Sequence, residues 1–232
     1  MDDYKNKLFS ILGDSISTFE GISVPKESAF YTTTVKLSSN VITANDTWWG
    51  IVIEKLGGKL LVNNSISGST VSLDKAYEYQ SYGCSDERTS VLGLDGLKPD
   101  VIMVYLGTND WGKSVSIKAE SFSSELKDCD VFSNAYSSML EKLKRNYPDA
   151  EIWCFTLAVG FRASDKTKLF ADCGGKFDIS EYCKAIRSCA EKYGCRLIEL
   201  YEDKQPFETF DGFHPNNIGM KILADNVLSN II

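Results

Sequence analysis

The sequence predicts a single α/β domain in which helices cover a mainly parallel, five-stranded sheet. Short apolar runs alternate with amphipathic stretches along the 232 residues, and this alternation is typical of strands that alternate with helices. The run Val101–Leu106 is apolar at every position, as expected of a strand buried on both faces of a parallel sheet. A chain of this length can bury a sizeable core without a second domain, so residues 1–232 are expected to form one domain.

The individual elements follow from this pattern. The predicted strands are Lys7–Leu12, Lys59–Asn63, Val101–Leu106, Glu151–Leu157 and Arg196–Leu200. The predicted helices are Thr47–Leu56, Val131–Asn146, Ile179–Tyr193 and Asn216–Ser229. Gly57, Pro148 and Gly194 follow the first three helices, since glycine and proline commonly end a helix. Pro215 is expected in the first turn of the last helix, where its missing N–H has no cost.

Two long segments, Ser17–Asp46 and Phe161–Lys176, do not fit simple strand–helix units. The first is rich in threonine, serine and asparagine, and it is longer than most connections in a compact domain. We expect each segment to be either ordered around a functional site or mobile.

Composition excludes several classes of function. Hydrophobic residues make up 43% and charged residues 25%, which is ordinary for a globular protein. The formal charge of −7, without a basic cluster, argues against binding to nucleic acid or to an anionic membrane. No apolar run approaches the roughly 20 residues of a membrane-spanning helix, and the polar N-terminus does not resemble a signal peptide. We therefore expect a cytoplasmic protein without membrane insertion; secretion would require a presequence that has been removed. The sequence leaves the oligomeric state open.

The seven cysteines are scattered, and none form a C-x-x-C pair. With a single histidine in the chain, they do not suggest a zinc site, so no metal and no cofactor are expected. We expect reduced thiols, with Cys154 in a strand and Cys189 in a helix buried as small hydrophobic residues. A disulfide between Cys173 and Cys183 is the alternative for an exported form.

Polar residues follow four of the predicted strands. Ser15 comes after the first strand, Gly68 after the second and Asn109 after the third. Asp211 and His214 lie in the loop after the fifth strand. Ligands of open α/β sheets bind outside the carboxyl ends of the strands, so these four segments are expected to meet at one edge of the sheet.

The chemistry that uses these residue types is acyl transfer. A serine hydroxyl is a weak nucleophile until a base removes its proton, and His214 is the only imidazole in the chain. Asp211 could accept the other ring N–H and thereby fix the tautomer. The backbone N–H groups of Ser15 and Gly68 and the side-chain amide of Asn109 could stabilise an oxyanion.

Each of these features also has a structural explanation. Gly13-Asp14-Ser15 could be an ordinary strand-to-helix turn, and Asn109 could cap a helix after its strand. Asp211 could cap the last helix, and His214 could be a buried structural residue. The order of the residues and their common position at strand ends favour the functional interpretation.

The chain resembles the SGNH, or GDSL-type, hydrolase superfamily in four blocks that occur in the order of that family. The blocks are Leu12-Gly13-Asp14-Ser15, Asn64-Ser65-Ile66-Ser67-Gly68, Gly107-Thr108-Asn109-Asp110 and Asp211-Gly212-Phe213-His214-Pro215. The first block departs from the common pattern because it lacks the leucine that names the GDSL group, and no catalytic group is lost by this. The nucleophile is not in the G-x-S-x-G turn of α/β-hydrolases, so that fold is disfavoured.

The resemblance implies a flavodoxin-like three-layer α/β/α sandwich and a serine hydrolase. It implies Ser15 as nucleophile, His214 as base and Asp211 as the carboxylate that orients His214. It also implies an oxyanion hole formed by Ser15, Gly68 and Asn109. Asp14, although it is adjacent to the nucleophile, is implied to be structural.

The superfamily includes carbohydrate O-deacetylases, short-chain esterases, lysophospholipases, thioesterases and some acyltransferases, and the fold does not choose among them. Trp111 and Phe213 are expected to wall the site, and Arg162 is expected either to contact an anionic group or to be a solvated surface residue. The acidic composition argues against an interfacial lipase. We expect a small-molecule ester of a short acyl group, such as an acetyl group on a carbohydrate.

The sequence leaves three alternatives to a serine hydrolase open. A non-catalytic binding module would be expected to lack Ser15, His214 or the oxyanion donors, and this chain has all of them. Transfer of the acyl group to an acceptor other than water uses the same intermediate. Metal-dependent hydrolysis is poorly supported, because a single histidine is few for a transition-metal site.

Overall fold

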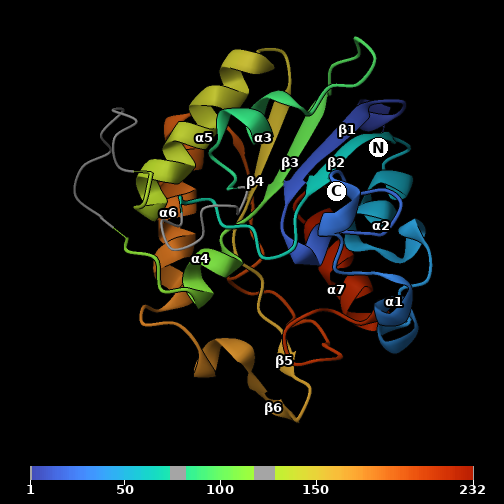
Figure 1. The fold of residues 1–232 in the computed structure, drawn as a ribbon, viewed down its shortest axis with the longest axis vertical. Helices are drawn as coiled ribbons and strands as arrows, with labels where there is room; N and C mark the ends of the chain where they lie inside the picture. Colours follow the sequence, from blue (N-terminus) through green and yellow to red (C-terminus); the bar gives the residue numbers. More distant parts are fainter. Residues whose placement is uncertain (1, 74–81, 118–128, 232) are drawn as a thin grey trace.

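The computed structural model describes residues 2–73, 82–117 and 129–231, and these contain a five-stranded sheet between two layers of helices (Figure 1). All four pairs of neighbouring strands are parallel. In spatial order the strands are β2 (Lys59–Ser65), β1 (Leu8–Gly13), β3 (Val101–Tyr105), β4 (Glu151–Phe155) and β7 (Arg196–Ile198). Numbered within this sheet, the order is 2-1-3-4-5, which is the flavodoxin-like order. The predicted fold class is confirmed.

The main helices are divided between the two faces of the sheet. α2 (Trp48–Lys55) and α7 (Asn217–Leu228) pack together on one side, and Figure 1 shows the others on the opposite side. These are α3 (Asp86–Ser90), α5 (Phe132–Asn146) and α6 (Ile179–Lys192). Parallel strands require crossover connections that place helices on both faces, and this produces the three layers.

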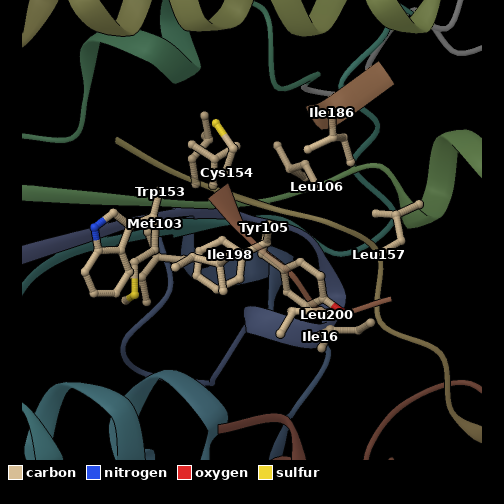
Figure 2. Packing of buried hydrophobic residues seen from close by; sticks show 14 of the residues in the cluster. Ile16, Met103, Tyr105, Leu106, Trp153, Cys154, Leu157, Ile186, Ile198 and Leu200 are labelled. Carbon is tan, nitrogen blue, oxygen red and sulfur yellow. The ribbon is translucent and has the colours of Figure 1, made fainter. Parts of the chain in front are cut away.

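Side chains alternate across the sheet and fill both interfaces. Tyr105 of β3 and Phe155 of β4 pack against Trp48 of α2, with ring centroids 5.7 and 5.4 Å from that of Trp48. Cys154 points to the opposite face, toward Ile186 of α6 (Figure 2). Every residue of β3 is buried, as its apolar sequence predicts.

The predicted elements have nearly the observed bounds, and the differences at helix starts arise from capping. The side chain of Thr47 accepts a hydrogen bond from the N–H of Gly50 at 3.1 Å, and that of Asn216 accepts one from Gly219 at 2.8 Å. Both residues are N-caps outside their helices. Pro215 therefore precedes the cap, and the expectation that it occupies the first turn of α7 is wrong.

Both long segments contain regular structure that the sequence did not predict. Segment 17–46 includes α1 (Thr33–Ser39) and the short 3₁₀ turns Lys26–Ser28 and Ala44–Asp46. Segment 161–176 forms a hairpin of β5 (Phe161–Arg162) and β6 (Asp165–Leu169), followed by the 3₁₀ turn Phe170–Cys173. α3 and α4 (Thr108–Gly112) were also not predicted, because five residues are too few to show helical periodicity. The other 3₁₀ turns are Asp2–Tyr4 and Ser15–Ser17.

The two cysteines expected to be buried, Cys154 in β4 and Cys189 in α6, are buried in the structure, whereas Cys129 and Cys195 are half-buried. Cys183 is also buried in α6 with a free thiol, and the side chain of Cys173 lies outside the part of the chain that the structure describes. Within the described ranges, no helix has the length and apolarity needed to cross a membrane.

Candidate active site

The site lies where three strands end at the same level. Gly13 at the end of β1 is paired with Ser65 of β2 on one side and with Tyr105 of β3 on the other. The connection after β1 leads to β2 on one side of β1, and the connection after β2 crosses back to β3 on the other side. Such a switch point leaves a crevice outside the carboxyl ends of the strands. Ser15, in the turn after β1, is therefore at the position where this fold binds ligands.

Ser15 is the first residue of a 3₁₀ turn, and Asp14 is the residue that caps it. One carboxylate oxygen of Asp14 accepts the N–H of Ile16 at 3.0 Å. The side chain of Ser15 lies against the imidazole ring of His214, with its Oγ 2.9 Å from Nε2. Only 3% of Ser15 is exposed, so little bulk water competes for the hydroxyl.

His214 is oriented by Asp211. The Nδ1 atom of His214 is 2.7 Å from Oδ2 of Asp211. The other oxygen, Oδ1, accepts the backbone N–H groups of Phe213 at 2.9 Å and His214 at 2.7 Å. Burial raises the pKa of Asp211, but the hydrogen bonds from the ring and backbone of His214 outweigh this and lower it overall. The carboxylate is thus ionised and can accept the Nδ1 proton, which leaves Nε2 to accept the proton of Ser15.

This geometry argues against the structural explanations for the same residues. Asp211 does not cap α7, because Asn216 does. Asn109 lies inside α4, whose N-cap is Gly107, and its side-chain amide donates to the carbonyl of Ser69 instead of capping the helix. His214 contacts Ser15 from the far end of the chain.

The candidate oxyanion donors come from the turn after β1, the loop after β2 and helix α4. Gly68 has a φ of +75° in a turn closed by the N–H of Ser69 and the carbonyl of Ile66, at 3.1 Å. Among the described residues, no acceptor is recorded for the backbone N–H of Gly68 or of Ser15. The Nδ2 atom of Asn109 donates to the carbonyl of Ser69 at 3.0 Å and to Oδ2 of Asp14 at 3.4 Å.

Two buried carboxyl groups lie beneath these donors. Desolvation raises the pKa of Asp14 to about 7 and that of Asp110 to about 6. Asp110 accepts the backbone N–H groups of Val71 at 2.8 Å and Ser72 at 3.0 Å. Asp110 thereby fixes the backbone that follows Gly68, which is a structural role.

The residues expected to contact the substrate occupy different environments. Phe213 is half-buried, with its ring centroid 5.3 Å from that of His214. Arg162 is half-buried in β5. Trp111 is only 2% exposed, and its Nε1 donates to the carbonyl of Phe177 at 3.2 Å. Trp111 therefore packs against segment 170–177 and helps to hold it in place.

Phe30 is a site residue that the sequence reasoning missed. Its ring is stacked on the imidazole of His214, with centroids 3.6 Å apart and an interplanar angle of 19°. The neighbouring Tyr31 donates its hydroxyl to the carbonyl of Pro215 at 2.8 Å. Segment 17–46 is thus attached to the loop that carries the base. No local pattern could indicate a contact between positions so far apart in the chain.

The fold and the site define a class of three-layer, flavodoxin-like α/β proteins with a hydrogen-bonded serine, histidine and aspartate at the carboxyl edge of the sheet. A family model described as GDSL-like Lipase/Acylhydrolase matches residues 7–231. The chain belongs to this family, and membership places it among carboxylic ester hydrolases.

Solved structures agree with this result. A protein from Bacteroides ovatus described as a GDSL-like lipase is 26% identical, with a TM-score of 0.74 and 97% of both chains covered. Another from Bacteroides uniformis with the same description is 30% identical, with a TM-score of 0.72, covering 97% of this chain and 95% of that chain. The cellulase/esterase CelE of Acetivibrio thermocellus is 30% identical over 90 residues, which is 36% of this chain and 10% of that protein.

Proposed function

We propose that the protein hydrolyses carboxylic esters through an acyl-Ser15 intermediate. The observation that carries this proposal is the hydrogen-bonded sequence of side chains from Asp211 to His214 to Ser15, at 2.7 and 2.9 Å. These are the distances at which a base can take the proton of a serine hydroxyl.

The reaction follows from the positions of these groups. Nε2 of His214 takes the hydroxyl proton as Oγ of Ser15 attacks the ester carbon. The tetrahedral intermediate then collapses to the acyl-serine, and His214 gives its proton to the leaving alcohol. Water attacks the acyl-serine in the second half by the same route, which frees the acid. Asp211 stabilises the imidazolium in both halves.

Three donors are available to the oxyanion. The N–H groups of Ser15 and Gly68 have no recorded acceptor among the described residues. Asn109 can turn one N–H from Asp14 to the substrate, because that hydrogen bond is the longer of its two at 3.4 Å.

The substrate we propose is a short-chain ester, with acetyl on a carbohydrate as the leading case. His214 must protonate the leaving alcohol, so the alcohol lies beside this ring. The rings of Phe30, Phe210 and Phe213 surround His214 and are each half-buried. Aromatic rings with an exposed part suit the apolar face of a sugar. The partial match to a protein named as a cellulase/esterase supports the same class.

The test is hydrolysis of p-nitrophenyl acetate and butyrate by the wild type, Ser15→Ala and His214→Ala, with Ser38→Ala as the matched control. Ser38 is an exposed serine on α1, so its removal should leave activity unchanged. We expect losses of roughly 10⁴- to 10⁶-fold in kcat for the two site variants. Intact mass after treatment with a fluorophosphonate should show one adduct, absent from Ser15→Ala.

Activity that persists in Ser15→Ala would refute the proposed mechanism. The substrate class is tested separately, by comparing kcat/KM for acetate, butyrate and an acetylated sugar. A preference for the longer acyl chain would contradict the short-chain proposal without affecting the mechanism. Adding an acceptor alcohol and measuring the new ester distinguishes acyl transfer from hydrolysis.

A further inference from the structure

Arg88 is a buried cation that lies beneath the proposed oxyanion hole. It belongs to the short helix α3, and 1% of its surface is exposed. Its guanidinium donates from Nη2 to the carbonyls of Asn64 at 2.7 Å and Gly13 at 3.1 Å. Nη1 donates to Oγ of Ser69 at 2.8 Å, and Nε donates to the side-chain oxygen of Asn64. One side chain thus binds four oxygen atoms in three residues.

These oxygen atoms belong to the segments that carry the oxyanion donors. Gly13 is the last residue of β1, before the turn that holds Ser15. Asn64 is the penultimate residue of β2, and Ser69 follows Gly68 in the loop after that strand. The positions of two of the three proposed donors therefore depend on the guanidinium of Arg88.

The third donor is linked to the same cluster. The carbonyl of Ser69 accepts the Nδ2 group of Asn109 at 3.0 Å. Because Arg88 holds the hydroxyl of Ser69, a displacement of Ser69 would also move the partner that orients Asn109. The positions of all three donors are in this way linked to the guanidinium group of Arg88.

The base of the Arg88 side chain is itself held in place. The carbonyl of Thr89 accepts the Nδ2 group of Asn146 at 2.9 Å, which ties α3 to α5. Nζ of Lys142, also on α5, lies 3.1 Å from Oδ1 of Asp86. α3 is therefore a fixed support, from which the side chain extends to the loops.

A role in stability alone does not account for this arrangement. Burying a guanidinium is unfavourable: desolvation lowers the pKa of Arg88 to about 10, although the negative charge of Asp14 opposes this. An apolar side chain would fill the same space without that cost. What the guanidinium adds is a rigid, planar set of donors with fixed directions, which an apolar residue or a lysine does not provide.

We propose that Arg88 is a positioning residue for ester hydrolysis, which holds the loops after β1 and β2 so that the oxyanion donors converge. It acts through Gly13, Asn64 and Ser69 and does not touch the substrate. The inference rests on the proposed function of Ser15 as nucleophile and extends it to the support of the oxyanion hole.

The experiment measures kcat and KM for p-nitrophenyl acetate in Arg88→Lys and Arg88→Ala. Small displacements of such donors cost about 10²-fold and loss of one costs about 10²- to 10³-fold, so we expect kcat to fall about 10- to 10³-fold. KM should change less than about threefold, because the ground-state ester makes weaker use of these donors. The matched control is Arg145→Ala. Arg145 is an exposed arginine of α5, and its Nη2 lies 3.8 Å from Oδ1 of Asp86, a residue of α3 like Arg88.

Chemical rescue separates positioning from a merely structural effect. Guanidinium ion at low millimolar concentration should restore part of the kcat of Arg88→Ala, and should not change Ser15→Ala or Arg145→Ala. Near-ultraviolet circular dichroism establishes that each variant is folded. If Arg88→Ala does not fold, Arg88→Lys decides, since it keeps a cation and most of the buried volume while losing the planar set of donors.

The inference is overturned if folded Arg88→Lys retains wild-type kcat, or if the change appears only in KM. Failure of the proposed function gives a different result, namely that Ser15→Ala retains activity. In that case the effect of Arg88 on kcat would have to arise elsewhere. The two failures are therefore distinguishable within one set of proteins.

Discussion

At the scale of single residues, Asp14 shows how two adjacent side chains can have different roles. It is next to Ser15, yet its oxygens accept the N–H groups of Ile16 and Asn109 inside the protein. Only 1% of Asp14 is exposed, so it is not available to a substrate. This agrees with the structural role that the family resemblance implied. The proposed nucleophile is instead Ser15, whose hydroxyl is hydrogen-bonded to His214.

Asp14 should make stability depend on pH in a defined direction. Burial raises its pKa from 3.8 to about 7, so the folded protein holds a proton that the unfolded chain releases. This contribution to stability is fully present below pH 4 and is lost as the pH rises through about 7. Asp14→Asn cannot titrate. We therefore expect the free energy of unfolding of the wild type, relative to Asp14→Asn, to fall between pH 4 and pH 7.

The measurement is urea unfolding of both proteins at several pH values from 4 to 8. Other titrating groups, including Asp211 with its lowered pKa, are present in both proteins and largely cancel in the difference. A difference that stays constant over this range would show that Asp14 does not carry the raised pKa.

At the scale of elements, the segment that follows β6 is held by contacts from α4. Gly174 and Gly175 lie directly over the indole of Trp111, where an added Cβ at Gly175 would be 2.6 Å from Nε1. The ring of Phe170 also packs on Trp111, with centroids 5.7 Å apart, and on Phe213 at 4.9 Å. Trp111 thus links α4, which carries Asn109, to the segment beside His214.

Replacing Trp111 should loosen this segment. Trp111→Phe removes the hydrogen bond to the carbonyl of Phe177, and we expect faster hydrogen exchange over residues 170–177 together with a several-fold lower kcat/KM. Hydrogen exchange read by mass spectrometry gives the first result. The matched control is Trp153→Phe, since the indole N–H of Trp153 is buried without a partner among the described residues. Equal exchange over residues 170–177 in both variants would contradict the prediction.

At the scale of the whole molecule, buried side chains form one hydrophobic cluster that extends from Phe9 to Val227. It includes residues from both faces of the sheet and from helices at each end of the chain. We propose on this basis that residues 1–232 form a single cooperative domain.

A single domain should unfold in one transition. The four tryptophans Trp48, Trp49, Trp111 and Trp153 are all buried and come from both halves of the chain, so their fluorescence reports on the whole core. We expect fluorescence, far-ultraviolet and near-ultraviolet circular dichroism to give the same midpoint in urea. Separate midpoints would indicate two units that unfold independently.

Features that depend on neighbouring residues are predictable from the sequence, whereas many contacts between distant segments are not. Strands such as Val101–Tyr105 and helices such as Phe132–Asn146 were predicted because apolar periodicity is a local property. The convergence of Ser15, Asn109 and His214 was also predicted, since parallel strands bring their carboxyl ends to one edge. The helices α3 and α4, of five residues each, and the two-residue strand β5 are too short to show their period.

The sequence by itself therefore determined the sheet, the main helices and which residues could do the chemistry. Tertiary structure alone decided that Phe30 stacks on His214 and that Arg88 is buried against Gly13, Asn64 and Ser69. In the sequence Arg88 belongs to an ordinary charged run, Asp86-Glu87-Arg88, which would usually be assigned to the surface. Its burial depends on oxygen atoms supplied by Gly13, Asn64 and Ser69. Such compensation comes from segments distant in the chain, so it exists only once the fold has brought them together.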